Sequence, residues 1–461
     1  MNVNDELTHL AVESIGWLAE QRGAETLWLD DAGEKTWEDF GDAFEAARRQ
    51  CLEAGVAPGS VIVTPGEASW ESLAWLFGAA ATQAVVVPLR RERVAELHGW
   101  KNFIEIGWLA QDGGIARVGE GTMSPVAERL LGELRARDHA GLVLATGGTT
   151  GTPKLVLHDL AVLLTTVPVR AGRAKRTLPL MRFDHIGGLD MAWRALAGGQ
   201  VLVAPPVELN PEAVAVTIAR HRVEVMPATP SFLNLLLMAE IHRTHDLSSL
   251  RVVPYGAEPM PVGLLARLRA ALPEVEFVQR FGTSETGALP VQNIGAGLLL
   301  REDQAGFAWK IVDDELWVQS PARALGYLAG NSQGFDVAGW FRTGDLAERL
   351  PDGTVRVLGR REELINVGGE KVLPAEIEGV LLAHPMVADC RVGPEPSAVL
   401  GQIVAAEIVW RGPERDAVAV KRQLHAFGAG RIARQKLPTV VRLVEKIEAT
   451  RNLKKLRASR S

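Results

Sequence analysis

The sequence is poor in cysteine: only Cys51 and Cys390 occur among its 461 residues. Two thiols cannot build a disulfide framework or a four-thiolate zinc site, so disulfide-stapled secreted domains and zinc modules are excluded. No run of about 18 consecutive apolar residues occurs, and the N-terminal segment has acids rather than a basic run. We therefore expect a cytoplasmic protein in a reducing compartment, with no membrane partner.

The composition is that of a large globular protein. Hydrophobic residues make up 47% of the chain and charged residues 23%, and a mean hydropathy of +0.06 excludes a largely disordered chain. The length alone predicts roughly three structural units. It is too long for a small binding module.

Basic residues gather near the C-terminus. The net charge of the chain is −6, yet residues 361–461 hold 17 Lys and Arg against 12 Asp and Glu. Residues 421–461 alone hold 12 Lys and Arg against 2 Asp and Glu, which favours a phosphate-bearing ligand or an acidic partner, with a solvated charged surface as the alternative. No nucleic-acid-binding motif accompanies the charge, so we expect no nucleic-acid partner.

Hydrophobic periodicity predicts an α/β fold with parallel sheets covered by helices. The expected elements are helices over residues 37–54 and 230–240 and strands over residues 61–64, 84–87, 201–204, 223–227, 251–254 and 275–279. Further along, short strands over residues 315–319 and 355–358 flank the turn Pro351-Asp352-Gly353, which indicates a small β unit. A helix over 374–383 and a strand over 402–409 then predict another α/β segment.

A glycine- and threonine-rich loop follows an apolar strand. The strand, residues 141–145, leads into Thr146-Gly147-Gly148-Thr149-Thr150-Gly151-Thr152-Pro153-Lys154. Glycines let backbone N–H groups wrap anionic oxygens, hydroxyls donate further hydrogen bonds, and a lysine adds a point charge. The segment predicts a phosphate-binding loop, with an ordinary turn as the alternative. It lacks the Gly-Lys-Ser/Thr ending of P-loop NTPases and is not a dinucleotide-binding turn.

Further motifs follow this loop in order. They are Gly256-Ala257-Glu258-Pro259, Phe281-Gly282-Thr283-Ser284-Glu285-Thr286, Trp340-Phe341-Arg342-Thr343-Gly344-Asp345, residues 359–365 with Gly368-Gly369-Glu370-Lys371, and residues 374–378 with His384-Pro385. With the loop, this series resembles the motifs of the AMP-forming adenylating superfamily, which comprises acyl-CoA and aryl-CoA synthetases, carrier-protein adenylation enzymes and luciferases.

The resemblance implies a two-domain ligase. It places a large N-terminal domain of helix-covered sheets with a small β unit at residues 1–359, a hinge at 360–362 and a smaller, mobile C-terminal α/β domain at 363–461. A fatty or aryl carboxylic acid would be activated by ATP and Mg²⁺ as acyl-AMP and then transferred to the thiol of coenzyme A. A carrier-protein phosphopantetheine is the alternative acceptor, and a non-catalytic nucleotide-binding relative is the alternative of another class.

The resemblance also assigns roles to single residues. Nucleotide binding is expected from Thr146, Gly147, Gly148, Thr149, Thr150, Gly151, Lys154, Gly256, Ala257, Glu258, Phe281, Gly282, Thr283, Ser284, Asp345 and Arg360. Glu285 is the expected catalytic Mg²⁺ ligand, since this hard cation prefers oxygen. Asp345 suits the ribose diol, because a carboxylate can accept from two neighbouring hydroxyls. Taken alone, Glu285 would be a loop acid and Asp345 a turn residue.

The resemblance extends to the mobile segment and the acid pocket. Thr450-Arg451-Asn452-Leu453-Lys454-Lys455-Leu456-Arg457 matches the pattern of a catalytic lysine, so Lys454 is expected to bridge the acid and the α-phosphate, with Lys455 as the alternative because Leu453 replaces the usual glycine. Glu362 is the expected hinge residue, and Gly368 and Gly369 are expected along the thiol channel. His185 is expected to border the substrate carboxylate, and neighbouring Arg182 and Asp184 to recognise a polar substituent or to pair with each other.

Overall fold

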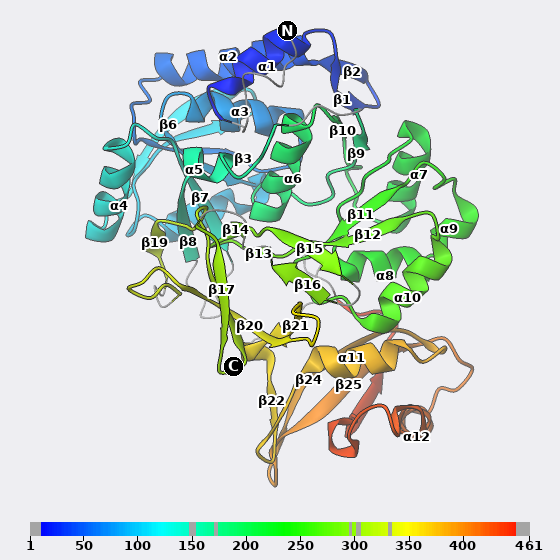
Figure 1. The fold of residues 1–461 in the computed structure, drawn as a ribbon. Coiled ribbons are helices and arrows are strands. Elements are labelled where there is room, and N and C mark those ends of the chain that lie inside the picture. Colours follow the sequence, from blue (N-terminus) through cyan, green and yellow to red (C-terminus); the bar gives the residue numbers. More distant parts are fainter. Residues whose placement is uncertain are drawn as a thin grey trace.

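A computed structural model describes residues 11–146, 154–169, 174–294, 297–300, 306–330 and 334–448 (Figure 1). The expected loop residues Gly147, Gly148, Thr149, Thr150 and Gly151 lie outside the described residues, as do Lys454 and Lys455. No helix of the described ranges is long and apolar enough to cross a membrane. The fold is α/β, as the sequence predicts.

The largest sheet has seven strands in the order β19-β8-β7-β4-β3-β5-β6. Their bounds are β3 Val61–Pro65, β4 Val85–Leu89, β5 Ile106–Gln111, β6 Gly114–Glu120, β7 Gly141–Thr146, β8 Lys154–Asp159 and β19 Gly326–Ala329. The centre is parallel, as expected, but β6, β8 and β19 run antiparallel to their neighbours. The expectation of parallel sheets was wrong at the edges: a two-residue turn at Asp112 and Gly113 joins β5 to β6 in a hairpin, and β8 and β19 pair antiparallel to their neighbours.

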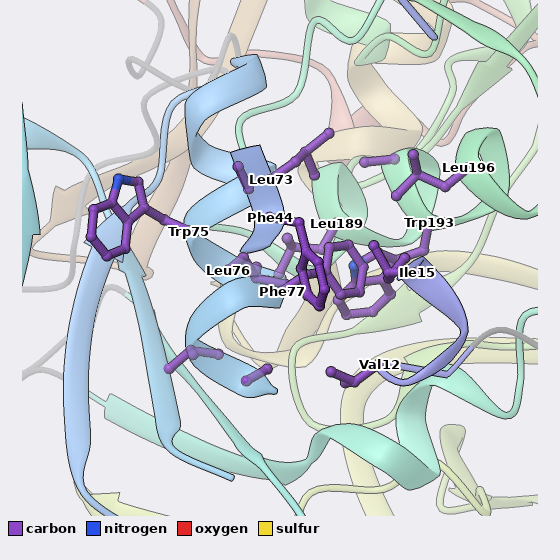
Figure 2. Packing of buried hydrophobic residues seen from close by; sticks show 14 of the residues in the cluster. Val12, Ile15, Phe44, Leu73, Trp75, Leu76, Phe77, Leu189, Trp193 and Leu196 are labelled. Atoms are coloured by element: carbon purple, nitrogen blue, oxygen red, sulfur yellow. The ribbon is translucent and has the colours of Figure 1, made fainter. Parts of the chain in front are cut away.

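Helices cover this sheet and build the main core. They are α1 Ser14–Arg22, α2 Trp37–Glu53, α3 Trp70–Ala80, α4 Pro125–Arg135, α5 Leu160–Leu164 and α6 Ile186–Ala197. Figure 2 shows Leu189 and Trp193 of α6 meeting Phe77 of α3 and Ile15 of α1. All four side chains are almost completely buried. The core therefore holds one side of α6 in place, which matters because its other side faces the cavity described below.

A second set of strands is separate from this sheet and is held together mainly by parallel pairs. Strands β1 Thr26–Asp30, β2 Gly33–Thr36, β9 Arg176–Thr177 and β10 Val201–Val203 form one sheet, and β11 Val252–Tyr255 pairs with β12 Glu276–Gln279. The strand expected over 223–227 is reduced to isolated bridges from Val225 to Thr177 and Val252. Pro227 lacks the N–H that a longer ladder would need. Helices α7 Pro211–His221, α8 Pro230–Met238, α9 Ile241–Thr244 and α10 Val262–Ala271 accompany these strands.

The small β unit is a six-stranded sheet in the order β15-β16-β21-β20-β18-β17. Its strands are β15 Val291–Ile294, β16 Gly297–Leu300, β17 Ala308–Val312, β18 Glu315–Gln319, β20 Phe341–Arg349 and β21 Val355–Arg360. β20 and β21 form the antiparallel hairpin that the turn at Pro351-Asp352-Gly353 predicts. A single 3-10 turn, Arg361–Glu363, follows β21 directly.

The smaller C-terminal domain has its own sheet and core. Strands β22 Ile365–Val367, β23 Glu370–Val372, β24 Val387–Ser397, β25 Gly401–Trp410 and β26 Val440–Leu443 pack against α11 Pro374–Leu382 and α12 Ala417–Gly428. In Figure 1, α11 lies on the side of this domain that faces α10. The buried Asn234 of α8 donates from Nδ2 to the Ala388 carbonyl at 3.2 Å, which ties the two domains together.

Candidate active site

A cavity of about 1450 Å³ lies where the N-terminal domain, the small β unit and α11 meet. Its lining includes Thr146, Lys154, His185, Gly256, Ala257, Glu258, Phe281, Gly282, Thr283, Ser284, Glu285, Asp345, Arg360 and Glu362. The structure therefore brings together nearly every described residue that the motifs single out. Gly368 and Gly369 do not line this cavity.

The ends of the glycine-rich loop are fixed by strand pairing. Thr146 ends β7 and Lys154 begins β8, and the two residues are directly opposite in the antiparallel register. Gly330 lies against the stem of Lys154: a Cβ at Gly330 would come within 3.0 Å of Lys154 Cγ, and its φ of +95° suits glycine. The lysine therefore enters the cavity from a rigid strand end rather than from a free loop.

Glu285 is held by groups from distant parts of the chain. Tyr327 Oη donates to Glu285 Oε1 at 2.9 Å, and the Ala324 N–H donates to the Glu285 carbonyl at 2.7 Å. His158, fully buried on β8, donates from Nε2 to the Ser284 carbonyl at 2.6 Å. Burial lowers the pKa of His158, so the ring is neutral and acts as a fixed donor. Sequence reasoning missed both His158 and Tyr327.

The surroundings of Glu285 fit a magnesium ion shared with phosphates. Among the described residues the carboxylate accepts a hydrogen bond only at Oε1, which leaves its other oxygen to meet a cation. No group of three or more His, Cys, Asp or Glu side chains in the described ranges could hold a metal by itself. Mg²⁺ usually keeps water and binds through one or two carboxylates plus substrate phosphates, and one glutamate is the donor set found here.

The buried Asp345 pairs with Arg360, a partly exposed residue on the neighbouring strand. They are opposite in the β20–β21 register, and Arg360 Nε lies 3.0 Å from Asp345 Oδ1. Arg360 also donates to the Thr343 carbonyl at 2.9 Å, while the Thr343 hydroxyl accepts from the Asp345 N–H at 3.0 Å. Burial raises the pKa of Asp345 to about 6, although Arg360 opposes the shift. The carboxylate therefore changes charge just below neutral pH.

This pKa leads to a pH prediction. If Asp345 accepts from the ribose hydroxyls, adenosine affinity should be full well above pH 6 and should fall as the pH drops through about 6, because the protonated acid loses acceptor capacity. Adenosine is the right probe because it carries no phosphate that titrates in this range. Calorimetric titrations between about pH 5 and pH 8 would measure the effect.

Asp345→Asn supplies the control for that titration. The variant should bind adenosine weakly at every pH and show no inflection. A wild-type affinity that is flat across pH 6, or an inflection that survives in Asp345→Asn, would remove Asp345 from the ribose site.

The Gly256–Glu258 turn packs against the strand before Phe281. A Cβ at Gly256 would lie 2.7 Å from the Arg280 carbonyl oxygen, so only glycine permits this approach. Ala257 adopts a φ of +67°, which is unusual for a residue other than glycine. Glu258 Oε2 accepts from the Ser231 N–H at the start of α8 at 3.1 Å. These contacts fix the turn, which forms part of one wall of the cavity.

His185 stands at the N-terminal end of α6, above a buried ionic network. Its Nε2 lies 3.5 Å from Asp184 Oδ1, and Asp184 is bound by Arg90 Nε at 2.8 Å and by an Arg93 amino group at 3.2 Å. Arg93 also donates to the carbonyl of Ala145, next to the glycine-rich loop, at 3.3 Å. The suggested pairing of Asp184 with Arg182 was wrong, because Arg90 and Arg93, which follow strand β4, bind the Asp184 carboxylate instead. Sequence reasoning missed Arg90 and Arg93.

Gly368 and Gly369 form the turn between β22 and β23. Their φ values are +58° and +96°, which suits glycine in a tight hairpin turn. The Gly368 N–H donates to the Leu400 carbonyl at 3.1 Å, and the Gly369 N–H donates to Asn366 Oδ1 at 3.0 Å. In the observed arrangement of the two domains this turn lies away from the cavity.

Two family models match the chain. The model of the AMP-binding enzyme matches residues 119–328, and the model of the AMP-binding enzyme C-terminal domain matches residues 376–454. Together they cover more than half of the chain. The chain belongs to the AMP-binding enzyme family. The family suggested by the ordered motifs is thus confirmed.

Relatives of this AMP-binding enzyme include ligases. It is 31% identical to 4-coumarate--CoA ligase-like 2 of Arabidopsis thaliana over 302 residues, which are 59% of this chain and 53% of the relative. It is 32% identical to pyochelin synthase PchD of Pseudomonas aeruginosa over 347 residues, which are 67% of this chain and 60% of the relative. The match thus spans between about half and three fifths of these relatives.

Solved structures share the fold of this AMP-binding enzyme over nearly its whole length. The anthranilate CoA ligase AuaEII, in complex with anthranoyl-AMP, gives a TM-score of 0.77 at 19% identity, covering 99% of this chain and 97% of that chain. The amide bond synthetase McbA from Marinactinospora thermotolerans gives a TM-score of 0.74 at 21% identity, covering 96% and 98%. At these identities the likeness establishes the fold.

Proposed function

We propose that this AMP-binding enzyme is an ATP-dependent acid:thiol ligase. It activates a carboxylic acid as acyl-AMP with release of pyrophosphate and then transfers the acyl group to the thiol of coenzyme A. The observation that carries the proposal is that one cavity gathers Lys154, Glu285, Asp345 and His185. The names of its relatives, among them a 4-coumarate--CoA ligase-like protein, support the reaction class.

In the first step a carboxylate oxygen attacks the α-phosphorus of ATP, and the bond from that phosphorus to pyrophosphate breaks. Anionic groups must be brought together, so cations and N–H donors are needed where charge develops. Lys154 binds the β- and γ-phosphates through its positive charge. Asp345, together with Arg360, binds the ribose. Mg²⁺ bound at Glu285 would neutralise phosphate charge. Lys454, from the segment outside the described residues, completes the site between the acid and the α-phosphate.

In the second step the thiol sulfur attacks the acyl carbon, AMP leaves, and the thiol proton passes to solvent. For this step we propose that residues 363–461 rotate about a hinge at 360–362 relative to residues 1–359. The rotation would carry the exposed turn at Gly368 and Gly369 to the cavity, where the absence of Cβ atoms admits a narrow thiol arm. The basic segment 421–461 supports either coenzyme A or an acidic carrier protein as the thiol donor.

Lys154→Ala tests the nucleotide side of this proposal. We expect the KM for ATP in pyrophosphate release to rise roughly tenfold, which is the worth of one hydrogen bond to a charged group. The melting temperature should be nearly unchanged, because a lysine at a cavity wall adds little to a packed core.

Lys175→Ala is the matched control, since this exposed lysine does not line the cavity. It should leave both the KM and the melting temperature unchanged. A melting drop in Lys154→Ala with intact ATP kinetics would contradict the proposed role. Nucleotide binding without pyrophosphate release for any acid would favour a non-catalytic relative.

A further inference from the structure

Helix α6 presents two different faces. Leu189, Trp193 and Leu196 point into the main core, where Figure 2 shows them packed among aromatic and aliphatic side chains. Asp190 and Arg194, one turn apart, line the cavity on the other face. The core thus fixes the helix, and this charged pair lies among apolar residues of the same helix, Ile186, Met191 and Ala195, that also line the cavity.

The distance along α6 from His185 to Arg194 indicates how long an acid the pocket can hold. His185 begins the helix, and at 1.5 Å per residue the Arg194 Cα lies about 13 Å further along the axis. His185 marks the end where the reacting carboxylate is expected, so Arg194 marks a second point beyond it. An arginine side chain can reach back several ångströms, and the span between the two ends suits a ring or a short carbon chain.

Arg194 has an acid partner, and a second arginine stands close to it. Arg194 Nε lies 2.8 Å from Asp190 Oδ2, and both side chains keep some exposure to the cavity. Arg280, which follows β12, is anchored by its N–H to the Tyr255 carbonyl at 2.7 Å and also lines the cavity. The Arg280 residue keeps solvent exposure, and partial desolvation together with the charge of Arg194 lowers its pKa. Within the described ranges no carboxylate lies within 4 Å of the Arg280 guanidinium.

This wall therefore has one more positive charge than negative charge. Nearby Gln200, whose Oε1 accepts from the Thr177 hydroxyl at 2.6 Å, adds an amide donor. A hydrocarbon chain placed here would desolvate the guanidinium groups without offering them an acceptor, which is costly. A carboxylate would accept from both arginines in short, charge-assisted hydrogen bonds.

We infer that the acid activated by this enzyme carries a second carboxylate, which Arg280 and Arg194 bind at the far end of the acid pocket. The substrate class is a dicarboxylic acid with a spacer of several carbons or one ring, rather than a fatty acid. The inference rests on the proposed function, since it describes the substrate of that same cavity.

The test compares acids that differ only in the second carboxylate. Pyrophosphate release would be measured with straight-chain dicarboxylic acids and with monocarboxylic acids of equal length, and with benzoic acids that carry or lack a second carboxyl on a side chain. We expect kcat/KM for the best diacid to exceed that of its monoacid partner by roughly tenfold to a hundredfold, as for one or two hydrogen bonds to a charged group.

Substitutions in the cavity wall test whether Arg280 and Arg194 cause the preference for the diacid. Arg280→Gln and Arg194→Gln should each reduce the preference for the diacid at least tenfold while leaving kcat/KM for the monoacid within about twofold. Asp190→Asn should change the preference in the opposite direction, because it removes the competing acid. Arg220→Gln, an exposed arginine outside the cavity, is the matched control and should change nothing. Melting temperatures and adenosine affinity would confirm that each variant is folded.

A second readout separates this inference from the proposed function. Calorimetric titration of the diacids and monoacids, without ATP, should show diacid binding that Arg280→Gln weakens. If diacids bind in a way that Arg280→Gln weakens but no acid releases pyrophosphate, the ligase proposal fails while the anion site stands. Equal use and equal binding of diacids and monoacids, or a diacid preference that survives in both arginine variants, would overturn the inference.

Discussion

Lys454→Ala is expected to lower acyl-adenylate formation by roughly a hundredfold or more, while thioester formation from supplied acyl-AMP changes little. A charge aimed at the α-phosphate acts only where the carboxylate attacks it, so its loss raises the barrier of the first step. Lys454 lies outside the described residues, and the prediction rests on the motif that ends at Arg457. Single-turnover assays of pyrophosphate release and of thioester production would measure the two steps separately.

Lys455→Ala is the natural control for this variant. Leu453 replaces the glycine usual before the catalytic lysine, and a residue with a Cβ atom adopts a positive φ less readily. If Lys455→Ala loses the first step and Lys454→Ala does not, the motif is displaced by one residue. Loss of both half-reactions in Lys454→Ala would instead indicate general damage to the enzyme.

Glu362→Pro is expected to preserve adenylation and to lower thioester formation by about tenfold or more. Proline fixes φ near −65°, a value that fits the 3-10 turn Arg361–Glu363, and a hinge that must adopt a second backbone state is then held in the first. Among the hydrogen bonds of the described residues none is donated by the Glu362 N–H, so the substitution breaks no such bond. The variant should therefore fold in the observed arrangement.

That arrangement explains which step survives. Asn234 bonds to Ala388 across the domains, α11 lines the cavity, and the turn at Gly368 and Gly369 lies away from it. Glu362→Gln, which keeps the backbone free, should retain both steps and serves as the control. If Glu362→Pro loses both steps equally, the effect is general damage; if it loses neither, Glu362 is not the hinge.

The parts of the site that the sequence could predict are those set by neighbours along the chain. Thr146 and Lys154 meet because the consecutive strands β7 and β8 pair antiparallel, and Asp345 and Arg360 meet because β20 and β21 do the same. The turn at Gly256 could be recognised from its motif, although its contacts with Arg280 and Ser231 come from other segments. In such places the local chain sets the relative positions of the motif residues, so these residues reach the cavity together.

The parts that could not be predicted depend on contacts between distant segments. Tyr327 reaches Glu285 because β19 adds to the edge of the central sheet, an antiparallel pairing that the expected parallel sheet did not include. Arg90 and Arg93 lie more than ninety residues from Asp184, yet they displace the nearby Arg182 as its partner. No periodicity in the sequence encodes which arginine reaches a buried acid.

The most direct test of the ligase account is to quantify every product of one reaction. The enzyme would be supplied with ATP, Mg²⁺, an acid and coenzyme A, and pyrophosphate, AMP and acyl thioester would be measured by mass spectrometry and coupled assays. The account predicts acid-dependent release of pyrophosphate, with one AMP and one thioester formed for each pyrophosphate, and acyl-AMP retained on the enzyme when coenzyme A is left out. Formation of ADP and phosphate, or nucleotide binding without pyrophosphate for any combination of acid and thiol, would contradict it.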